Sequence, residues 1–189
     1  LLQTYNSKGD RNTAWRFNVQ SSIQIKGTAN TAGSTLIRTA EDGHQSLFHY
    51  DMTQKMYLPN DGGTERITYS QNEWVYKQGE QKSISYYNQN GQLVRMADRD
   101  GHFFSFTYVN GTLASIKDSS TKQQITWSFA QGLLQDMTVT SDGKVIHHLH
   151  YEYNEQQQLS KVSRDLGKGS VYWITYAYVP DTHWISTIQ

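Results

Sequence analysis

The sequence predicts an all-β fold, in which an antiparallel sheet is built from successive hairpins. Tyr, Thr, Ile, Val, Phe and Trp, the residues that suit a pleated and half-buried surface, fill the stretches between 14 glycines. Apolar and polar residues alternate within these stretches, as they do on a strand with one buried face. Asp-Gly and Asn-Gly dipeptides separate the stretches. No segment of helical length carries an apolar stripe with helical spacing.

The alternation is clearest in the second half of the chain. The stretches 103–108, 125–129, 145–153 and 171–178 place aromatic and aliphatic residues at alternate positions. The residues expected to share a buried face are, stretch by stretch, Phe104, Phe106 and Tyr108; Ile125, Trp127 and Phe129; Val145, Leu149, Tyr151 and Tyr153; and Tyr172, Ile174, Tyr176 and Tyr178. Because alternate side chains lie on one face of a strand, each stretch predicts a strand with one apolar face.

Turn dipeptides predict where these strands end. They are Asp42-Gly43, Asp61-Gly62, Asn90-Gly91, Asp100-Gly101, Asn110-Gly111 and Asp142-Gly143. A two-residue type I′ turn requires a positive φ at both central positions, which Asn, Asp and Gly tolerate best. The chain therefore predicts a succession of tight hairpins.

The second half also repeats a motif. Each copy has an aromatic pair, a turn, a leucine or isoleucine position and another apolar residue three positions later. The leucine positions are Leu93, Leu113, Leu134, Leu159 and Ile185, spaced 20 to 26 residues apart, and the later apolar residues are Met96, Ile116, Met137, Val162 and Ile188. Because a single hairpin cannot bury its own apolar face, we expect neighbouring copies to bury both positions.

The repeat resembles a known family. The unit Tyr-x-Tyr, turn, Gly-x-Leu-x-x-Ile-x-Asp, best matched by Phe106–Asp118 and Tyr151–Asp165, is similar to the tyrosine–aspartate (YD) repeat of Rhs proteins. The third copy lacks the Asp that should follow Leu134, and the fifth copy lacks the Gly. Stretches of the first half resemble the opening segment and degenerate repeats of the Rhs region: Thr4-Tyr5-Asn6-Ser7, Trp15-Arg16-Phe17-Asn18, Asp42 to Tyr50, Tyr57-Leu58-Pro59 and Glu73-Trp74-Val75-Tyr76.

The resemblance implies both an architecture and a role. We expect degenerate repeats over residues 1–80 and tandem YD repeats over 81–189, joined in one continuous sheet. Such strips spiral into hollow shells in secreted polymorphic toxins, in Tc-toxin B and C components and in animal teneurins. The implied function is structural: part of a shell in a secreted or cell-surface bacterial protein. The implied partners are further YD repeats and a C-terminal toxin or effector polypeptide. No residue here matches the family's cleavage site, so no protease residue is carried over.

Composition excludes several other classes. Seventeen basic and seventeen acidic residues give a net charge of zero, which argues against binding nucleic acid. No apolar stretch approaches the roughly 18 residues of a spanning helix. The absence of Cys excludes disulfides, thiolate zinc sites and a cysteine nucleophile. We expect no cofactor. The opening at Leu1, without Met or a signal peptide, indicates a piece of a longer chain.

Exposed aromatic rings would support an alternative function, a carbohydrate- or cell-surface-binding β module. Trp74, Tyr76, Trp173 and Trp184 are the candidates, because flat aromatic faces stack on sugars. The same rings would equally fill a core between strands. Trp173 differs from its neighbours because it alternates out of phase with Tyr172 and Ile174.

Titratable residues offer weaker candidates. His148 and His150 share one strand face beside His147, and Glu152 could complete a metal site there; a solvent-facing position explains them as well. Six aspartates could pair as glycosidase carboxylates, namely Asp98, Asp100, Asp118, Asp136, Asp142 and Asp165, but turn capping explains them too. We therefore assign no catalytic or metal-binding residue and expect no enzyme.

The ends of the predicted sheet favour self-association. The sheet is expected to end at Tyr5 to Val19 on one side and at Val171 to Ile188 on the other. Residues 171–178 carry no charge and many β-branched or aromatic side chains, and an unpaired strand of this kind invites another strand. The zero net charge provides no long-range repulsion against association.

Overall fold

The computed structural model describes residues 3–5, 15–17, 19–79, 83–165 and 171–189. These residues form 18 β-strands and no helix, which confirms the all-β class. No helix within the described ranges is therefore long and apolar enough to cross a membrane. Some sequence expectations lie outside the described residues: the boundary at residue 80, Asn6-Ser7, Asn18 and the side chain of Tyr172.

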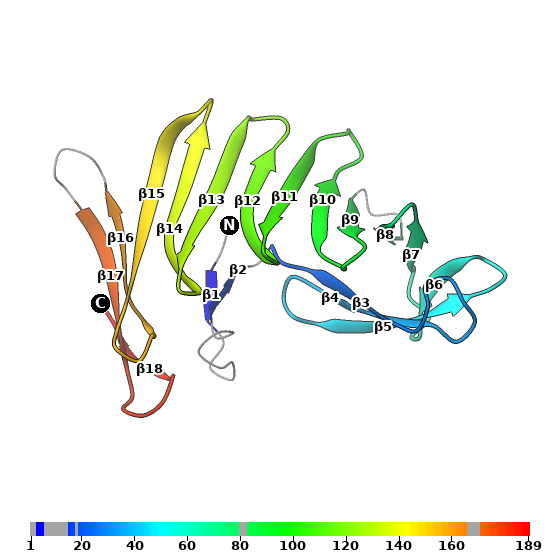
Figure 1. Ribbon diagram of the computed structural model, residues 1–189, viewed down its shortest axis with the longest axis horizontal. Helices are drawn as coiled ribbons and strands as arrows, with labels where there is room; N and C mark the ends of the chain where they lie inside the picture. The colour runs from blue at the N-terminus through cyan, green and yellow to red at the C-terminus, as the bar shows by residue number, and fades with distance from the viewer. Residues whose placement is uncertain (1–2, 6–14, 18, 80–82, 166–170) are drawn as a thin grey trace. The chain divides into compact units, whose positions relative to one another are not determined.

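The main sheet contains 16 antiparallel strands in chain order, each hydrogen-bonded to its neighbours in the sequence (Figure 1). They are β3 (Ser22–Lys26), β4 (Thr35–Thr39), β5 (Gln45–Asp51), β6 (Met56–Pro59), β7 (Glu65–Ser70), β8 (Glu73–Gln78), β9 (Ile84–Asn88), β10 (Leu93–Ala97), β11 (Phe103–Val109), β12 (Thr112–Asp118), β13 (Gln123–Ala130), β14 (Leu133–Ser141), β15 (Lys144–Tyr153), β16 (Leu159–Asp165), β17 (Val171–Tyr178) and β18 (Ile185–Ile188). A separate two-stranded sheet contains β1 (Gln3–Tyr5) and β2 (Trp15–Phe17).

Two expectations about the ends of the sheet are corrected. The segment from Tyr5 to Val19 does not form the first edge, because β1 and β2 pair with each other and β3 begins the main sheet. At the other end β18 is the edge strand, because it pairs with the second half of β17. Beyond that pairing, Thr175 and Gln189 exchange two backbone hydrogen bonds of 2.8 and 3.0 Å.

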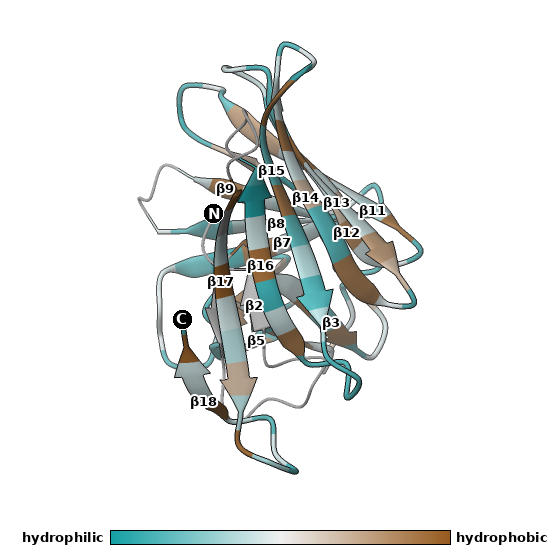
Figure 2. Ribbon diagram, turned by 90° about the vertical axis from the view of Figure 1, so that its left-hand side faces the viewer, coloured by the Kyte–Doolittle hydropathy of each residue, from teal (hydrophilic) through white to brown (hydrophobic). Residues whose placement is uncertain are grey.

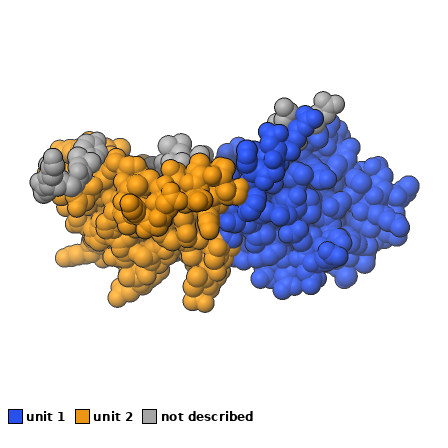
Figure 3. All heavy atoms as spheres, turned by 90° about the horizontal axis from the view of Figure 1, so that it is seen from above, with its two compact units in different colours: residues 1, 18–106 blue, residues 2–17, 107–189 orange. Residues whose placement is uncertain are grey.

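Contacts group the strands into two compact units (Figure 3). Unit 1 runs from β3 into β11, as far as Phe106. Unit 2 contains the rest of β11 and the strands up to β18, together with β1 and β2.

The turn dipeptides form two kinds of connection. At Asn110-Gly111 and Asp142-Gly143 both residues have positive φ, between 48° and 80°, which confirms the expected type I′ geometry. At Asp42-Gly43, Asp61-Gly62, Asn90-Gly91 and Asp100-Gly101 only the glycine has positive φ, so the expected type I′ geometry is wrong there. At Asn90-Gly91, Asn88 N–H donates to the Gln92 carbonyl at 2.9 Å, so the loop is one residue longer than a type I′ turn.

Unit 1 closes because β3 returns to the β9–β10 turn. The N–H of Ile23 donates to the carbonyl of Gly91 at 2.8 Å, and Ser22 forms a β-bridge with Gln92. Ser21 Oγ lies 3.0 Å from the buried hydroxyl of Tyr87. These contacts connect residues far apart in the sequence, so they hold the first strand of the unit against one of its last turns.

Arg38 on β4 reinforces this closure from inside. Its side chain is buried, its Nε donates to the Tyr87 hydroxyl at 3.2 Å, and its guanidinium lies 4.0 Å from the centre of the Tyr76 ring. Glu41 supplies a carboxylate at 3.4 Å. The buried cation is thus satisfied by a hydroxyl, an aromatic face and a carboxylate, as burial of a charge requires.

The loop between β3 and β4, residues 27–34, folds over Tyr57 on β6. The Tyr57 hydroxyl accepts from Asn30 N–H at 2.9 Å and lies 3.0 Å from Ser34 Oγ, so its fully buried ring leaves no polar atom unsatisfied. The centre of the Tyr57 ring lies 5.6 Å from that of Trp74, an edge-to-face distance. Unit 1 therefore has an aromatic core that is buried from solvent.

Unit 2 buries only one or two apolar residues on each of the strands β12 to β16. Its buried apolar residues are Leu113, Ile116, Trp127, Leu134, Tyr151 and Leu159. Hydrophobic and hydrophilic residues alternate along these strands (Figure 2). Phe129, on the same face as Trp127, is 43% exposed. Val145, which was expected to be buried with Leu149, is 62% exposed, because a register shift between Val139 and Thr140 pairs it with Thr140 on the opposite face of the sheet.

Four leucine positions of the repeat are confirmed as core. Leu93, Leu113, Leu134 and Leu159 are all buried. The residue three positions later is buried only at Ile116: Met96, Met137 and Val162 are half-buried, and Ile188 is 62% exposed. In the fifth copy the leucine position itself, Ile185, is only half-buried, so the expectation is wrong there. Four of the five copies therefore have a deeply packed leucine position, and only the second copy buries both positions.

Gly91→Ala should destabilise unit 1 because a Cβ at this position would overlap the carbonyl oxygen of Ile23. We expect a loss of about 2–4 kcal/mol in the free energy of unfolding, the sum of left-handed backbone strain and a disrupted closure. Gly101→Ala is the matched control, because Gly101 also has positive φ but has open space around its Cα. Urea denaturation should show only about 1–2 kcal/mol for the control. Equal losses in the two variants would contradict the closure.

Leu113→Ala should cost about 2–4 kcal/mol, because it leaves a cavity at a buried repeat position. Val109→Ala on the preceding strand is the control, since Val109 is 59% exposed and should change stability by less than about 0.5 kcal/mol. An unchanged denaturation midpoint for Leu113→Ala would show that the leucine position does not contribute to packing.

Candidate functional site

The tryptophan candidates separate into one core residue and two surface residues. Trp74 is 2% exposed, and its ring centre lies 4.3 Å from that of Tyr69, so its place in the core corrects its candidacy as a sugar-stacking surface. Tyr76 is buried on the same face of β8, beneath Arg38. Trp173 and Trp184 are 55% and 57% exposed. The structure therefore leaves both of its candidate stacking surfaces in unit 2.

Trp173 ends a row of directly paired residues on the face opposite the core. The row crosses five strands, β13 to β17, and consists of Ser128, Asp136, His150, Ser163 and Trp173. We call it the polar row. Each member of the row is the direct cross-strand partner of the next, because no register shift falls at these positions. The sequence alone does not reveal this register.

Asp136 is the electrostatic centre of the polar row. His148 Nε2 and His150 Nδ1 each lie 2.9 Å from its Oδ1, and Ser128 Oγ donates to its Oδ2 at 3.0 Å. Hydrogen bonds from His150, His148 and Ser128 hold the pKa of Asp136 below the ordinary carboxyl value, and the bond from His150 has the largest effect. The hydroxyl bonds to the carboxylate and not to an imidazole, so the order of groups differs from that of a nucleophilic triad, in which the base contacts the hydroxyl.

Glu152, which could have completed a metal site with His148 and His150, does not join them. Glu152 forms an ion pair of 2.8 Å with Lys161, and His147 Nδ1 lies 2.7 Å from a guanidinium nitrogen of Arg164. Across the described ranges, no three histidine, aspartate or glutamate side chains are grouped as a metal site requires.

Two of the five other aspartates cap their own turns. Asp98 Oδ1 accepts from the N–H groups of Asp100 and His102, at 2.9 and 3.0 Å. Asp118 accepts from Ser120 in the same way, and bonds from that residue's hydroxyl and N–H lower its pKa to about 2. Asp142 occupies a type I′ turn, and Asp165 ends β16. Local capping therefore accounts for Asp98 and Asp118.

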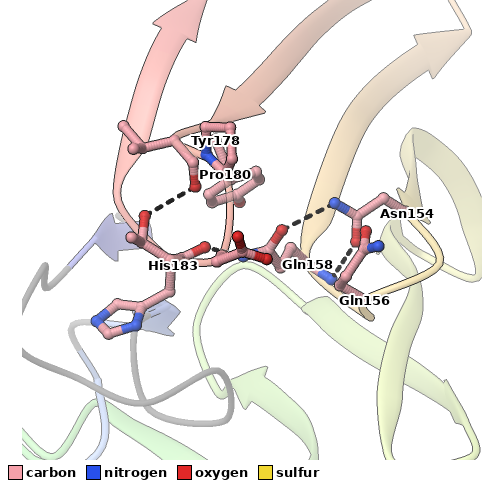
Figure 4. Close-up of a pocket in the computed structure, with 9 residues that line it drawn as sticks. Asn154, Gln156, Gln158, Tyr178, Pro180 and His183 are labelled. Carbon is pink, nitrogen blue, oxygen red and sulfur yellow. Dashed lines mark hydrogen bonds between the residues drawn. The ribbon is translucent and has the colours of Figure 1, made fainter.

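The sequence reasoning missed a pocket between two turns of unit 2. It has a volume of about 700 Å³ and lies between the β15–β16 and β17–β18 connections (Figure 4). The first connection contributes Asn154, Gln156 and Gln158, and the second contributes Tyr178, Pro180 and His183 (Figure 4). The one available signal was the amide-rich run from Asn154 to Gln158.

Comparison with known proteins adds no family: no family model matches the chain, and no curated protein matches it. The fold and the two surfaces of unit 2, namely the polar row and the amide-lined pocket, are therefore the basis for any function.

His150→Ala should raise the pKa of Asp136 toward the ordinary carboxyl value, because the hydrogen bond from His150, the largest cause of the lowered pKa, is lost. A depressed pKa means that Asp136 contributes stability above the ordinary carboxyl pKa, and that this contribution is lost as the pH falls through the folded-state value. NMR titration of the Asp136 carboxyl carbon measures the change. His147→Ala is the control and should leave the titration unaltered; a shift in the control of equal size would contradict the assignment.

Proposed function

We propose that this chain is a YD-repeat segment of a secreted or cell-surface Rhs-like protein, with a structural and non-catalytic role. In this role unit 2 forms part of a wall that encloses or presents a toxin or effector polypeptide of the same parent protein. The proposal requires no cofactor. Its secreted location rests on the resemblance of the repeat to YD repeats.

The observation that carries the proposal is the open apolar surface of unit 2. Nine large apolar side chains of this unit are exposed: Val109, Phe129, Val145, Ile146, Val171, Trp173, Val179, Trp184 and Ile188. These side chains do not all lie on one face, since Phe129 lies on the face of the buried apolar residues and Trp173 on the opposite face. An exposed apolar patch on a sheet face is a surface against which another polypeptide packs. Unit 1 instead closes over its own core.

The order of the strands supports the same role. The described strands of the main sheet follow one another in chain order, each hydrogen-bonded to its sequence neighbours, so further repeats would extend the sheet at β18 without rearranging it. Phe129 lies opposite Leu134, on the face that carries the buried apolar residues, whereas Trp173 lies on the polar row. We assign the face of Phe129 to the enclosed polypeptide.

Site-specific cross-linking in the parent protein tests this assignment. A photoreactive p-benzoylphenylalanine in place of Phe129 should cross-link to the effector portion of the parent chain. The same residue in place of Trp173 is the control and should give at most about a tenth of that yield, because the side chain projects from the opposite face of the sheet. Equal cross-linking from both positions, or none from Phe129, would overturn the structural role.

A further inference from the structure

The amide-lined pocket of unit 2 has the dimensions of a small-molecule site. Its volume of about 700 Å³ falls within the range of 300–1,000 Å³ that such sites occupy. It lies where the β15–β16 turn faces the β17–β18 connection (Figure 4). Neither the repeat motif nor a structural role of the sheet accounts for this hollow.

Hydrogen bonds between the two connections hold the pocket in shape. Gln158 Nε2 donates to the carbonyl of Thr182 at 2.6 Å, which ties one turn to the other. Asn154 Nδ2 donates to Gln158 Oε1 at 2.9 Å, and Gln158 N–H donates to Asn154 Oδ1 at 2.8 Å. Because both amides are fixed before any ligand arrives, little side-chain entropy remains to be lost on binding.

The pocket retains hydrogen-bonding capacity of both kinds. A carboxamide has two N–H donors and an oxygen with two lone pairs, so Asn154 and Gln158 each keep a donor beyond the bonds described above. Among the described residues, the side chains of Gln156 and Asp181 make no hydrogen bond or ion pair, and both line the pocket. These groups present donors and acceptors side by side.

The charge of the lining restricts the ligand. The lining includes no Lys or Arg, and Asp181 contributes a carboxylate. An anionic ligand would meet this carboxylate without a permanent cation to balance it, which disfavours phosphate, sulfate and acidic sugars. The rings of Tyr178 and Pro180 add apolar surface to the wall. The pocket thus favours an uncharged ligand with many hydroxyl groups and an apolar face.

We propose that this pocket binds a neutral sugar residue of a glycan. Each sugar hydroxyl both donates and accepts, which suits the mixture of amides and carboxylate, and the C–H face of a pyranose ring suits Tyr178 and Pro180. The exposed Trp184 directly follows the lining residue His183 in the chain. The inference is independent of the structural role, since it concerns the turns at the strand ends and not the face that carries Phe129.

NMR titration of the 189-residue chain with neutral trisaccharides tests the proposal. The probes are cellotriose, maltotriose and chitotriose, with sialyllactose as the acidic comparison. We expect at least one neutral probe to shift the side-chain amide signals of Asn154 and Gln158, and sialyllactose to bind at least about tenfold more weakly.

Gln156→Ala should reduce the affinity about five- to tenfold through the loss of hydrogen bonds. Gln123→Ala, an exposed glutamine on β13, is the matched control and should leave the affinity unchanged.

Three outcomes would overturn the proposal. The first is no shift of the pocket amides with any neutral probe at millimolar concentration. The second is binding that Gln156→Ala and Gln123→Ala affect equally, which would place the sugar elsewhere. The third is a preference for sialyllactose, which would contradict the charge argument. None of these outcomes bears on the cross-linking from Phe129, so the two proposals fail separately.

Discussion

The hydrogen bond between Ile23 and Gly91 is the contact on which the rest of unit 1 depends. It brings β3 to the β9–β10 turn, and only a glycine allows the approach, since a Cβ at this position would overlap the Ile23 carbonyl oxygen. Once the contact is made, the strands between must curl, and their apolar faces turn inward. The burial of Arg38 against Tyr87 is a consequence, because closure creates the interior that the guanidinium occupies.

The same hairpin repeat therefore yields two different interiors. In unit 1 the closing contact seals the core, so that Leu36, Tyr57 and Ile67 are fully buried. In unit 2 only one or two apolar residues on each of the strands β12 to β16 are buried, and Phe129 on the same face remains exposed. This contrast between a closed interior in unit 1 and a thinner one in unit 2 follows from the closing contact, which only unit 1 has among the described residues.

The features that sequence predicts well are local. Alternation identified the strands, Asn110-Gly111 and Asp142-Gly143 the tight turns, and the repeat the buried leucines, because each depends on residues within one hairpin. The features that it missed depend on long-range register. Alternation set Trp173 apart from Tyr172 and Ile174, but it did not tell that Trp74 is core and Trp173 is surface, because burial is decided by what lies opposite each strand.

In the candidate site, too, single residues could be identified from the sequence, but their long-range contacts could not. Asp136, His148 and His150 were each noted in the sequence, but their convergence requires the pairing of β14 with β15. Glu152 was expected with them and instead pairs with Lys161 on β16. The amide-lined pocket arises from two turns separated by two strands, and no spacing rule within one repeat would bring Gln158 to Thr182.

The strictly sequential strand order has a consequence for how such a chain varies in length. Duplication of one hairpin in unit 2 would insert two strands between existing neighbours and leave every other pairing intact, since no strand there pairs outside its sequence neighbours. The same duplication between β4 and β9 would move the β9–β10 turn away from β3 and break the ring of contacts that Gly91 completes. Unit 2 is thus free to gain or lose repeats during evolution, whereas the number of strands in unit 1 is fixed by its closure.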